Sequence, residues 1–229
     1  MDVPLQGSLL DTVDEVGLRT LGPAIRRTTL TRGAWIDVRP GWLTGADELF
    51  SRLRRHVPWQ AERRQMYDRK VDVPRLLGFC DEDDELPDPV LTRARSALSD
   101  HYASELGEPF RTAGLCYYRD GRDSVAWHGD TIGRGSTEDT MVAIISVGAP
   151  RALLLRPRGG GGASDQAGLH GVGAAGQGGA GQTIRQVLGH GDLLVMGGSC
   201  QRTWEHAIPK SAKPVGPRIS IQLRPRGVR

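Results

Sequence analysis

The sequence predicts an α+β protein whose core is a double-stranded β-helix (jelly roll) buttressed by N-terminal helices. Two amphipathic helical patterns lie in the first half of the chain, and short apolar runs separated by turn residues fill the second half. Helices followed by strands favour this architecture over a doubly wound α/β sheet, in which the two would alternate. A length of 229 residues and a hydrophobic content of 38% suit one domain, or a domain with a modest extension.

The N-terminal third of the chain is expected to support the core. Residues 1–33 are weakly patterned, which predicts an extended arm. Residues 34–38 indicate a strand, and residues 46–55 indicate a helix with one apolar face. Thr44 is the expected N-cap of that helix, since a threonine hydroxyl can accept a hydrogen bond from a free N–H of the first turn.

Residues 89–106 predict a second helix, which we expect to stop at Gly107. The apolar period then changes from helical to strand-like. Strands are expected at 113–118, 141–147, 152–155, 183–188, 192–196 and 218–223. We therefore place the jelly roll in residues 111–229, behind a support region at 34–110.

A glycine-rich segment interrupts the predicted jelly roll. Residues 159–181 contain eleven glycines in 23 positions and almost no apolar anchors. Such a composition cannot offset the entropy of ordering, so we expect a flexible surface insertion. Its single histidine, His170, is for that reason a poor candidate for a metal ligand.

Charge is distributed unevenly, although the formal net charge is only +3. Twelve basic and six acidic residues lie between positions 26 and 75, which suits a polyanionic partner such as nucleic acid. Only three of the thirty basic residues are lysine, and genome base composition alone can produce such an arginine bias. From charge alone, both interpretations stay open.

The cysteines indicate a reducing compartment, and the hydropathy indicates a protein that does not span a membrane. Cys80, Cys116 and Cys200 are widely spaced and odd in number, which predicts free thiols rather than disulfides. No run approaches the roughly 18 apolar residues that a membrane span needs, and the N-terminus lacks an apolar signal segment. We expect a cytoplasmic protein.

A metal site is predicted by His128 and Asp130, one residue apart, together with the distant His206. Two histidines and one carboxylate are the ligands of the facial triad in non-haem Fe(II) oxygenases. In an extended segment, side chains two positions apart point to the same face, so His128 and Asp130 can hold one cation. His190 lies between two glycines, which indicate a turn, and Glu205 would point to the side opposite its neighbour His206. His206 is therefore the preferred third ligand.

The last predicted strand alternates polar and apolar side chains. Its polar face holds Arg218, Ser220, Gln222 and Arg224. Beside a metal, a guanidinium fork on this face can bind a carboxylate with two parallel hydrogen bonds. We expect Arg218 to take the far carboxylate of a chelating cosubstrate and Arg224 to brace the metal side.

These motifs, in this order, resemble the AlkB family of Fe(II)- and 2-oxoglutarate-dependent dioxygenases. The resemblance is carried by four segments: Tyr118 to Gly121, Trp127 to Asp130, His206, and Arg218 to Arg224. It implies that His128, Asp130 and His206 bind Fe(II), that Tyr118, Arg218, Ser220 and Arg224 contact 2-oxoglutarate, and that O2 is the second cosubstrate.

By the same resemblance, the protein would oxidatively demethylate N-alkylated bases in DNA and act in alkylation damage repair. The alternatives are the same chemistry on RNA or tRNA and, from another class, a non-catalytic nucleic-acid-binding module; the complete triad and both arginines argue against the last. A weaker similarity through Trp59, Tyr67 and Arg75 makes these residues candidates for substrate contacts within a nucleotide-recognition region, with packing under the jelly roll as the alternative. We expect a monomer.

Three departures from the family pattern concern substrate and cosubstrate. Cys116 stands where the family usually has asparagine, and Ser220 and Gln222 replace the usual pair of polar residues in the last strand. Thr131 occupies a position at which many relatives carry an acidic residue. The choice of base therefore does not transfer from the family.

Overall fold

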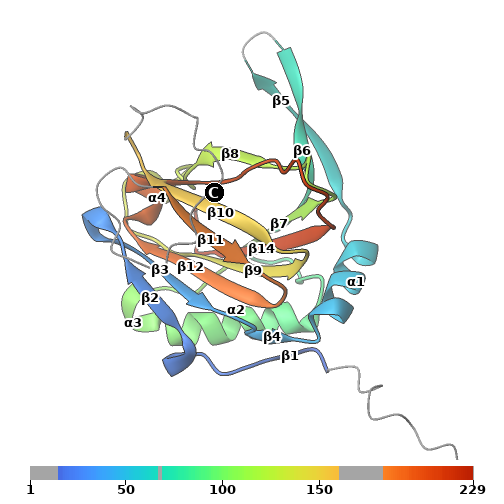
Figure 1. Ribbon diagram of the computed structural model, residues 1–229. Coiled ribbons are helices and arrows are strands. Elements are labelled where there is room, and N and C mark those ends of the chain that lie inside the picture. The colour runs from blue at the N-terminus through green and yellow to red at the C-terminus, as the bar shows by residue number, and fades with distance from the viewer. Residues whose placement is uncertain (1–14, 67–68, 160–182, 229) are drawn as a thin grey trace, which may run out of the picture.

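The computed structural model describes residues 15–66, 69–159 and 183–228, and Figure 1 shows their arrangement. The predicted metal ligands and the arginine strand fall within these ranges. Three expectations lie outside the described residues: those for residues 1–14, for Tyr67, and for the glycine-rich insertion beyond Gly159.

Two antiparallel sheets form the core, and a two-stranded ribbon lies beside them. The large sheet has the order β2 (Arg26–Thr29), β3 (Ala34–Arg39), β12 (Asp192–Gly198), β9 (Val142–Gly148), β14 (Arg218–Arg224), β7 (Thr112–Tyr118), β6 (Arg69–Cys80), β5 (Gln60–Met66). The small sheet has the order β11 (Ile184–Leu188), β10 (Arg151–Pro157), β13 (Trp204–Ile208), β8 (Val125–His128). The ribbon pairs β1 (Gly17–Leu18) with β4 (Leu43–Thr44).

The helices lie at the edges and on one face of this core. They are α1 (Ala46–His56), α2 (Pro89–His101), α3 (Ala103–Leu106) and the short α4 (Cys200–Thr203), with 3-10 turns at Gly22–Ala24, Thr31–Gly33 and Arg134–Ser136. In Figure 1, α1 and α2 lie against the large sheet on the side away from the small sheet.

The large sheet is buried on both faces, and strand alternation explains how. Ile145 of β9 points toward the helices and packs with Leu53 of α1 and Leu98 of α2. Its neighbour Ile144 points the other way and packs with Leu155 of the small sheet. A helix layer on one face and a second sheet on the other confirm the predicted helix-buttressed jelly roll.

Two predicted helix features are wrong in detail. Thr44 is not the N-cap of α1: it belongs to β4, its hydroxyl donates to the carbonyl of Glu15 (2.9 Å), and the cap is Gly45 with φ 62°. The predicted helix over 89–106 breaks at Tyr102, whose φ and ψ of −99° and 11° leave the helical region. The buried Tyr102 hydroxyl donates to Asp37 of β3 (2.9 Å), a tertiary contact that has no signal in helical periodicity.

The segment predicted as an arm adds to the sheet where it is described. β2 pairs along its whole length with β3, and β1 pairs with β4. One sheet therefore contains strands from all three segments into which we divide the chain, at 1–33, 34–110 and 111–229. The boundaries between them remain a prediction.

Candidate metal and cosubstrate site

Two neighbouring strands of the small sheet bring three ligand residues together. His128 ends β8 and stands directly opposite His206 of β13, while Asp130 follows β8 by two positions. One ligand atom from each of the three lies within 4.8 Å of the others. Two imidazoles and one carboxylate converging from adjacent strands could hold a divalent metal on one face and leave the opposite face open.

His128 is oriented by its own strand. Its Nδ1 lies 2.8 Å from the carbonyl oxygen of Ala126, which can only accept, so Nδ1 carries the proton. The lone pair of the ring is then on Nε2, which lies 3.9 Å from Oδ1 of Asp130. A histidine whose other nitrogen donates to a carbonyl is the usual form of a metal ligand.

Asp130 is held from two sides. Nε of Arg224 donates to its Oδ2 (2.7 Å), and its backbone N–H donates to Oε1 of Gln201 (2.9 Å). These contacts leave Oδ1 as the oxygen that faces the histidines. The carboxylate is therefore poised to offer one oxygen to a metal.

The charges of the cluster suit a cation. Burial alone would raise the pKa of Asp130, but the charge and hydrogen bond of Arg224, together with the neighbouring histidines, outweigh burial, and the pKa falls to about 2. Burial, followed by the neighbouring His128, lowers the pKa of His206 to about 3. At neutral pH the carboxylate is charged and His206 is neutral, which are the forms that bind metals.

A small inner cavity of about 80 Å³ lies beside the three ligands and ends at a buried arginine. Arg218 has no solvent exposure; its Nε donates to Oγ of Ser146 (2.9 Å), and both terminal nitrogens lack a hydrogen-bond partner. The ring of Tyr118 lies 5.4 Å from the guanidinium carbon. Burial lowers the pKa of Arg218, so a carboxylate placed here would satisfy both the charge and the two donors.

The polar face of β14 lines the same cavity, as the alternation predicted. Ser220 and Gln222 lie between the two arginines, and Nε2 of Gln222 donates to Oγ of Ser220 (2.7 Å). Cys116 of β7 faces them, with its sulfur 3.7 Å from Oε1 of Gln222. Three of the residues that depart from the family pattern, Cys116, Ser220 and Gln222, therefore form one contact group.

A larger outer cavity of about 930 Å³ opens on the ligand residues. It is lined on one side by the β5–β6 hairpin and on the other by the segment 128–132. Arg75 of β6 lines both cavities. Trp59 lines neither: its ring packs against Tyr117 at 5.3 Å, and its N–H donates to the carbonyl of Arg54 (3.3 Å).

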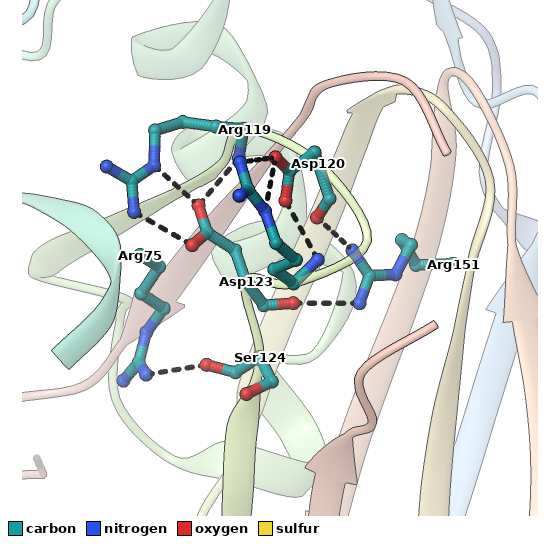
Figure 2. Close-up of polar contacts among 7 residues, drawn as sticks. Arg75, Arg119, Asp120, Asp123, Ser124 and Arg151 are labelled. Carbon is teal, nitrogen blue, oxygen red and sulfur yellow. Dashed lines mark hydrogen bonds and ion pairs between the residues drawn. The ribbon is translucent and has the colours of Figure 1, made fainter. Parts of the chain in front are cut away.

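The loop between β7 and β8 fixes Arg75 and a second arginine, Arg151, as Figure 2 shows. Arg75 donates to the carbonyl of Ser124 (3.1 Å), and Arg151 donates to the carbonyls of Asp120 (3.0 Å) and Asp123 (2.9 Å). The carboxylate of Asp123 accepts from the main chain and side chain of Arg119, which closes the loop.

The two alternative ligands lie elsewhere. Nδ1 of His190 accepts from the N–H of Gly148 (2.7 Å), and its Nε2 lies 3.3 Å from Asp47. Glu205 points to the outer face of β13 and pairs with Arg156 (3.2 Å). Neither belongs to the cluster of ligand atoms found among the described residues.

The contacts of Ser146 and Gln201 with site residues were not predicted from the sequence. Ser146 is a fully buried hydroxyl within an otherwise apolar strand, a signal that could have been noticed. Gln201 offers no such signal, because its contact with Asp130 arises only when α4 meets the end of β8.

Comparison with known proteins places this geometry in a family. A family model described as the 2OG-Fe(II) oxygenase superfamily matches residues 81–224. Alpha-ketoglutarate-dependent dioxygenase alkB homolog 3 of Bos taurus is 28% identical over 197 residues, 81% of this chain. DNA oxidative demethylase ALKBH2 of Homo sapiens is 28% identical over 194 residues, 78% of this chain. The chain belongs to the AlkB family of this superfamily.

A solved structure agrees with this assignment at the level of the fold. The structure of OsALKBH1 superimposes with a TM-score of 0.53 at 11% identity, covering 88% of this chain and 100% of that one. This AlkB-family chain spans 64% of the length of the bovine relative and 68% of the human one. Among the described residues, no helix is long and apolar enough to cross a bilayer.

Proposed function

We propose that the protein oxidatively dealkylates N-alkylated bases in DNA and thereby acts in alkylation damage repair. One observation carries the proposal: a cavity of about 930 Å³ opens on His128 and Asp130, while a smaller one leads from the same residues to the unpartnered Arg218. A substrate and a carboxylate-bearing cosubstrate can thus reach the same ligand cluster from two directions. The name of the human relative, a DNA oxidative demethylase, supports this activity, and the name of the bovine relative supports dioxygenase chemistry that depends on alpha-ketoglutarate.

His128, Asp130 and His206 would hold Fe(II), since their nitrogen and carboxylate donors fit that ion. Arg218 would bind the distal carboxylate of 2-oxoglutarate, and Arg224 would keep Asp130 in place. When bound, iron supplies the oxidation of the substrate by O2, coupled to the decarboxylation of 2-oxoglutarate to succinate.

Tyr118 and Ser220 line the inner cavity beside Arg218 and would complete the cosubstrate contacts. Tyr118 is almost fully buried, so this end of the cavity is closed to water. The chain's own contribution is to fix the cosubstrate at one end and admit the base at the other.

The outer cavity would orient the alkylated base. A base inside a duplex cannot reach it, so the base must be flipped out, at a cost of roughly a few kcal/mol, or be single-stranded already. Hydroxylation of the N-alkyl carbon would give a hemiaminal that releases formaldehyde and the repaired base. Arg75, which lines both cavities, is the sequence-predicted substrate residue that this arrangement favours.

The test measures succinate and formaldehyde. The protein is loaded anaerobically with Fe(II) and then receives 2-oxoglutarate, O2 and one of three substrates: methylated single-stranded DNA, the matching duplex, or methylated tRNA. We expect both products with DNA and their loss in His128→Ala. Turnover with tRNA alone would replace DNA by RNA as the substrate. No product with any substrate would contradict the enzymatic assignment and leave a binding module.

We also propose that the protein acts as a monomer in the cytoplasm and that residues 34–110 contain the nucleotide-recognition region. Sedimentation of the purified protein tests the first point. The second is supported by the β5–β6 hairpin, whose described part lines the outer cavity.

A further inference from the structure

Two arginines at the end of β10 reach across the outer face of the small sheet toward β8. The guanidinium carbon of Arg156 lies 4.2 Å from the centroid of the Trp127 ring. Arg158, two positions later, lies over Gly129: a Cβ added to that glycine would stand 2.8 Å from Nη2 of Arg158. The guanidinium of Arg158 therefore lies against the main chain between two of the proposed metal ligands.

Arg158 is a cation without a counter-ion among the described residues. Its neighbours on this face are paired, Arg156 with Glu205 and Arg202 with Asp139. Arg158 has no carboxylate within ion-pair distance in the part of the chain that the structure describes, and its Nε is buried without a hydrogen-bond partner. A partly buried guanidinium in this state favours a bound anion.

A second unpaired arginine stands behind the first. Nη1 of Arg32 donates to the carbonyl of Arg158 (3.2 Å), and the exposed Arg32 likewise has no carboxylate partner among the described residues. With φ 63°, it is also the one non-glycine residue in the described ranges that adopts a left-handed conformation. L side chains rarely adopt this conformation, and here it directs the side chain of Arg32 to the carbonyl of Arg158.

The placement of Arg158 suits a strand that enters the outer cavity. That cavity is bounded by the β5–β6 hairpin and residues 128–132, and Arg158 does not line it. Figure 1 shows β8 between the hairpin and α4, which lies beside the end of β10. The N–H of Arg158 donates to the carbonyl of Thr203 at the end of α4 (2.8 Å), which fixes its place just outside the cavity.

We propose that Arg158, supported by Arg32, forms a phosphate-binding site for the nucleic-acid strand whose base enters the outer cavity. The inference rests on the proposed function. A guanidinium fork fits two oxygens of a phosphodiester, and a contact with phosphate positions the strand without reading its sequence. Arg158 would thus hold the phosphate backbone of the nucleic acid next to Gly129, close to the proposed ligands His128 and Asp130 on either side.

The test is the equilibrium binding of a fluorescein-labelled, singly methylated single-stranded DNA to the metal-loaded protein without O2, followed by anisotropy at several salt concentrations. We expect Arg158→Ala to weaken binding by about tenfold and to reduce the slope of log K against log salt by about 0.7, the value for one phosphate on a single strand. Arg158→Lys should keep the slope and lose part of the affinity.

Arg32→Gly should weaken binding by about two- to fivefold, because glycine accepts the backbone conformation while the second charge and its hydrogen bond to the carbonyl of Arg158 are lost. The matched control is Arg185→Ala, since Arg185 is an exposed arginine of the same sheet on β11, far from Gly129 in strand order. It should change neither affinity nor slope. An RNA of the same sequence should show the same relative loss, since the contact is to phosphate.

Equal affinities and equal salt slopes for Arg158→Ala and Arg185→Ala would overturn the inference. If the wild-type protein still dealkylates the oligonucleotide in that case, only the phosphate site fails. If the wild-type protein binds the DNA, depends on Arg158, and yields no product, the phosphate site stands and the proposed activity fails. Wild-type protein that binds neither DNA nor RNA overturns both.

Discussion

Arg224 and Asp130 form a hydrogen-bonded ion pair of 2.7 Å between the last strand of the large sheet and the segment that follows β8. Both side chains are largely buried, with 15% and 6% of their surface exposed. The strand that carries the proposed cosubstrate arginine, Arg218, therefore also holds a proposed metal ligand through Arg224. If both roles hold, β14 would connect metal binding with cosubstrate binding.

Replacing Arg224 with alanine should weaken metal binding by about 10- to 100-fold, because outer contacts orient a ligand and their loss costs about that much. Titration of the apoprotein with Mn(II) or anaerobic Fe(II) measures it. Arg226→Ala is the control, since Arg226 pairs with Glu82 at the surface. An affinity that is the same in Arg224→Ala and the control would show that Asp130 keeps its orientation unaided.

Arg218→Lys should raise the KM for 2-oxoglutarate by about 10- to 100-fold, with a smaller change in kcat. Lysine keeps the charge but loses the two-pronged donor, and hydrogen bonds to charged groups contribute about 1.5–3 kcal/mol. Ser146→Ala should act in the same direction but less, since Ser146 only orients Nε of Arg218. A KM unchanged in Arg218→Lys would remove this arginine from the cosubstrate site.

Gly129→Ala should damage the metal site by a steric route. The new Cβ would lie 2.4 Å from the carbonyl oxygen of Gln201, so the main chain on either side must shift. Overpacking of this kind costs about 1–3 kcal/mol of unfolding free energy, and we expect metal affinity to fall with it. Chemical denaturation with and without metal measures both effects. Gly216→Ala is the control, because its Cβ would meet only Ala149 at 3.4 Å.

The metal-free protein should lose stability as the pH falls below about 6.5. The folded-state pKa of His206 is lowered from 6.5 to about 3, so between these values the unfolded chain binds a proton that the folded chain does not. Stability therefore declines on acidification through this window. Melting temperatures of wild type and His206→Gln at pH 7 and pH 5 should show a smaller decline for the variant. Parallel declines in the two proteins would contradict this assignment.

Patterns of period two and 3.6 predicted the jelly roll, because the strands that form its centre are strongly apolar. β9 and β12 are buried along most of their length and appear as apolar runs. β6 and β13 were missed, since one contains charges and Pro74 while the other mixes Glu205 and His206 with apolar residues. Both strands form by pairing with neighbouring strands. A local sequence pattern carries no information about such pairing.

Some residues of the candidate site could likewise be predicted from the sequence, and others could not. His128, Asp130 and His206 were found because ligand types at strand spacing carry a chemical signal, and the alternation of β14 placed Arg218 in the cavity. Trp59, a candidate for a substrate contact with packing as the alternative, packs against Tyr117. The sequence could not separate the two, since an aromatic residue looks the same in a core and in a binding site. The contact of Gln201 with Asp130 forms only when α4 meets the end of β8, so no local sequence pattern indicates it.

The position of β14 between β9 and β7 has a consequence for biosynthesis. During translation β14 leaves the ribosome after every other described strand, yet it inserts into the middle of the large sheet. Until then β7 and β9 expose the edges that later pair with it, and long-range pairing of this kind is slow. The nascent chain would therefore carry all three proposed metal ligands for some time before Arg224 is available to orient Asp130. Early metal capture by the growing chain would be weak, and loading would follow completion of the sheet.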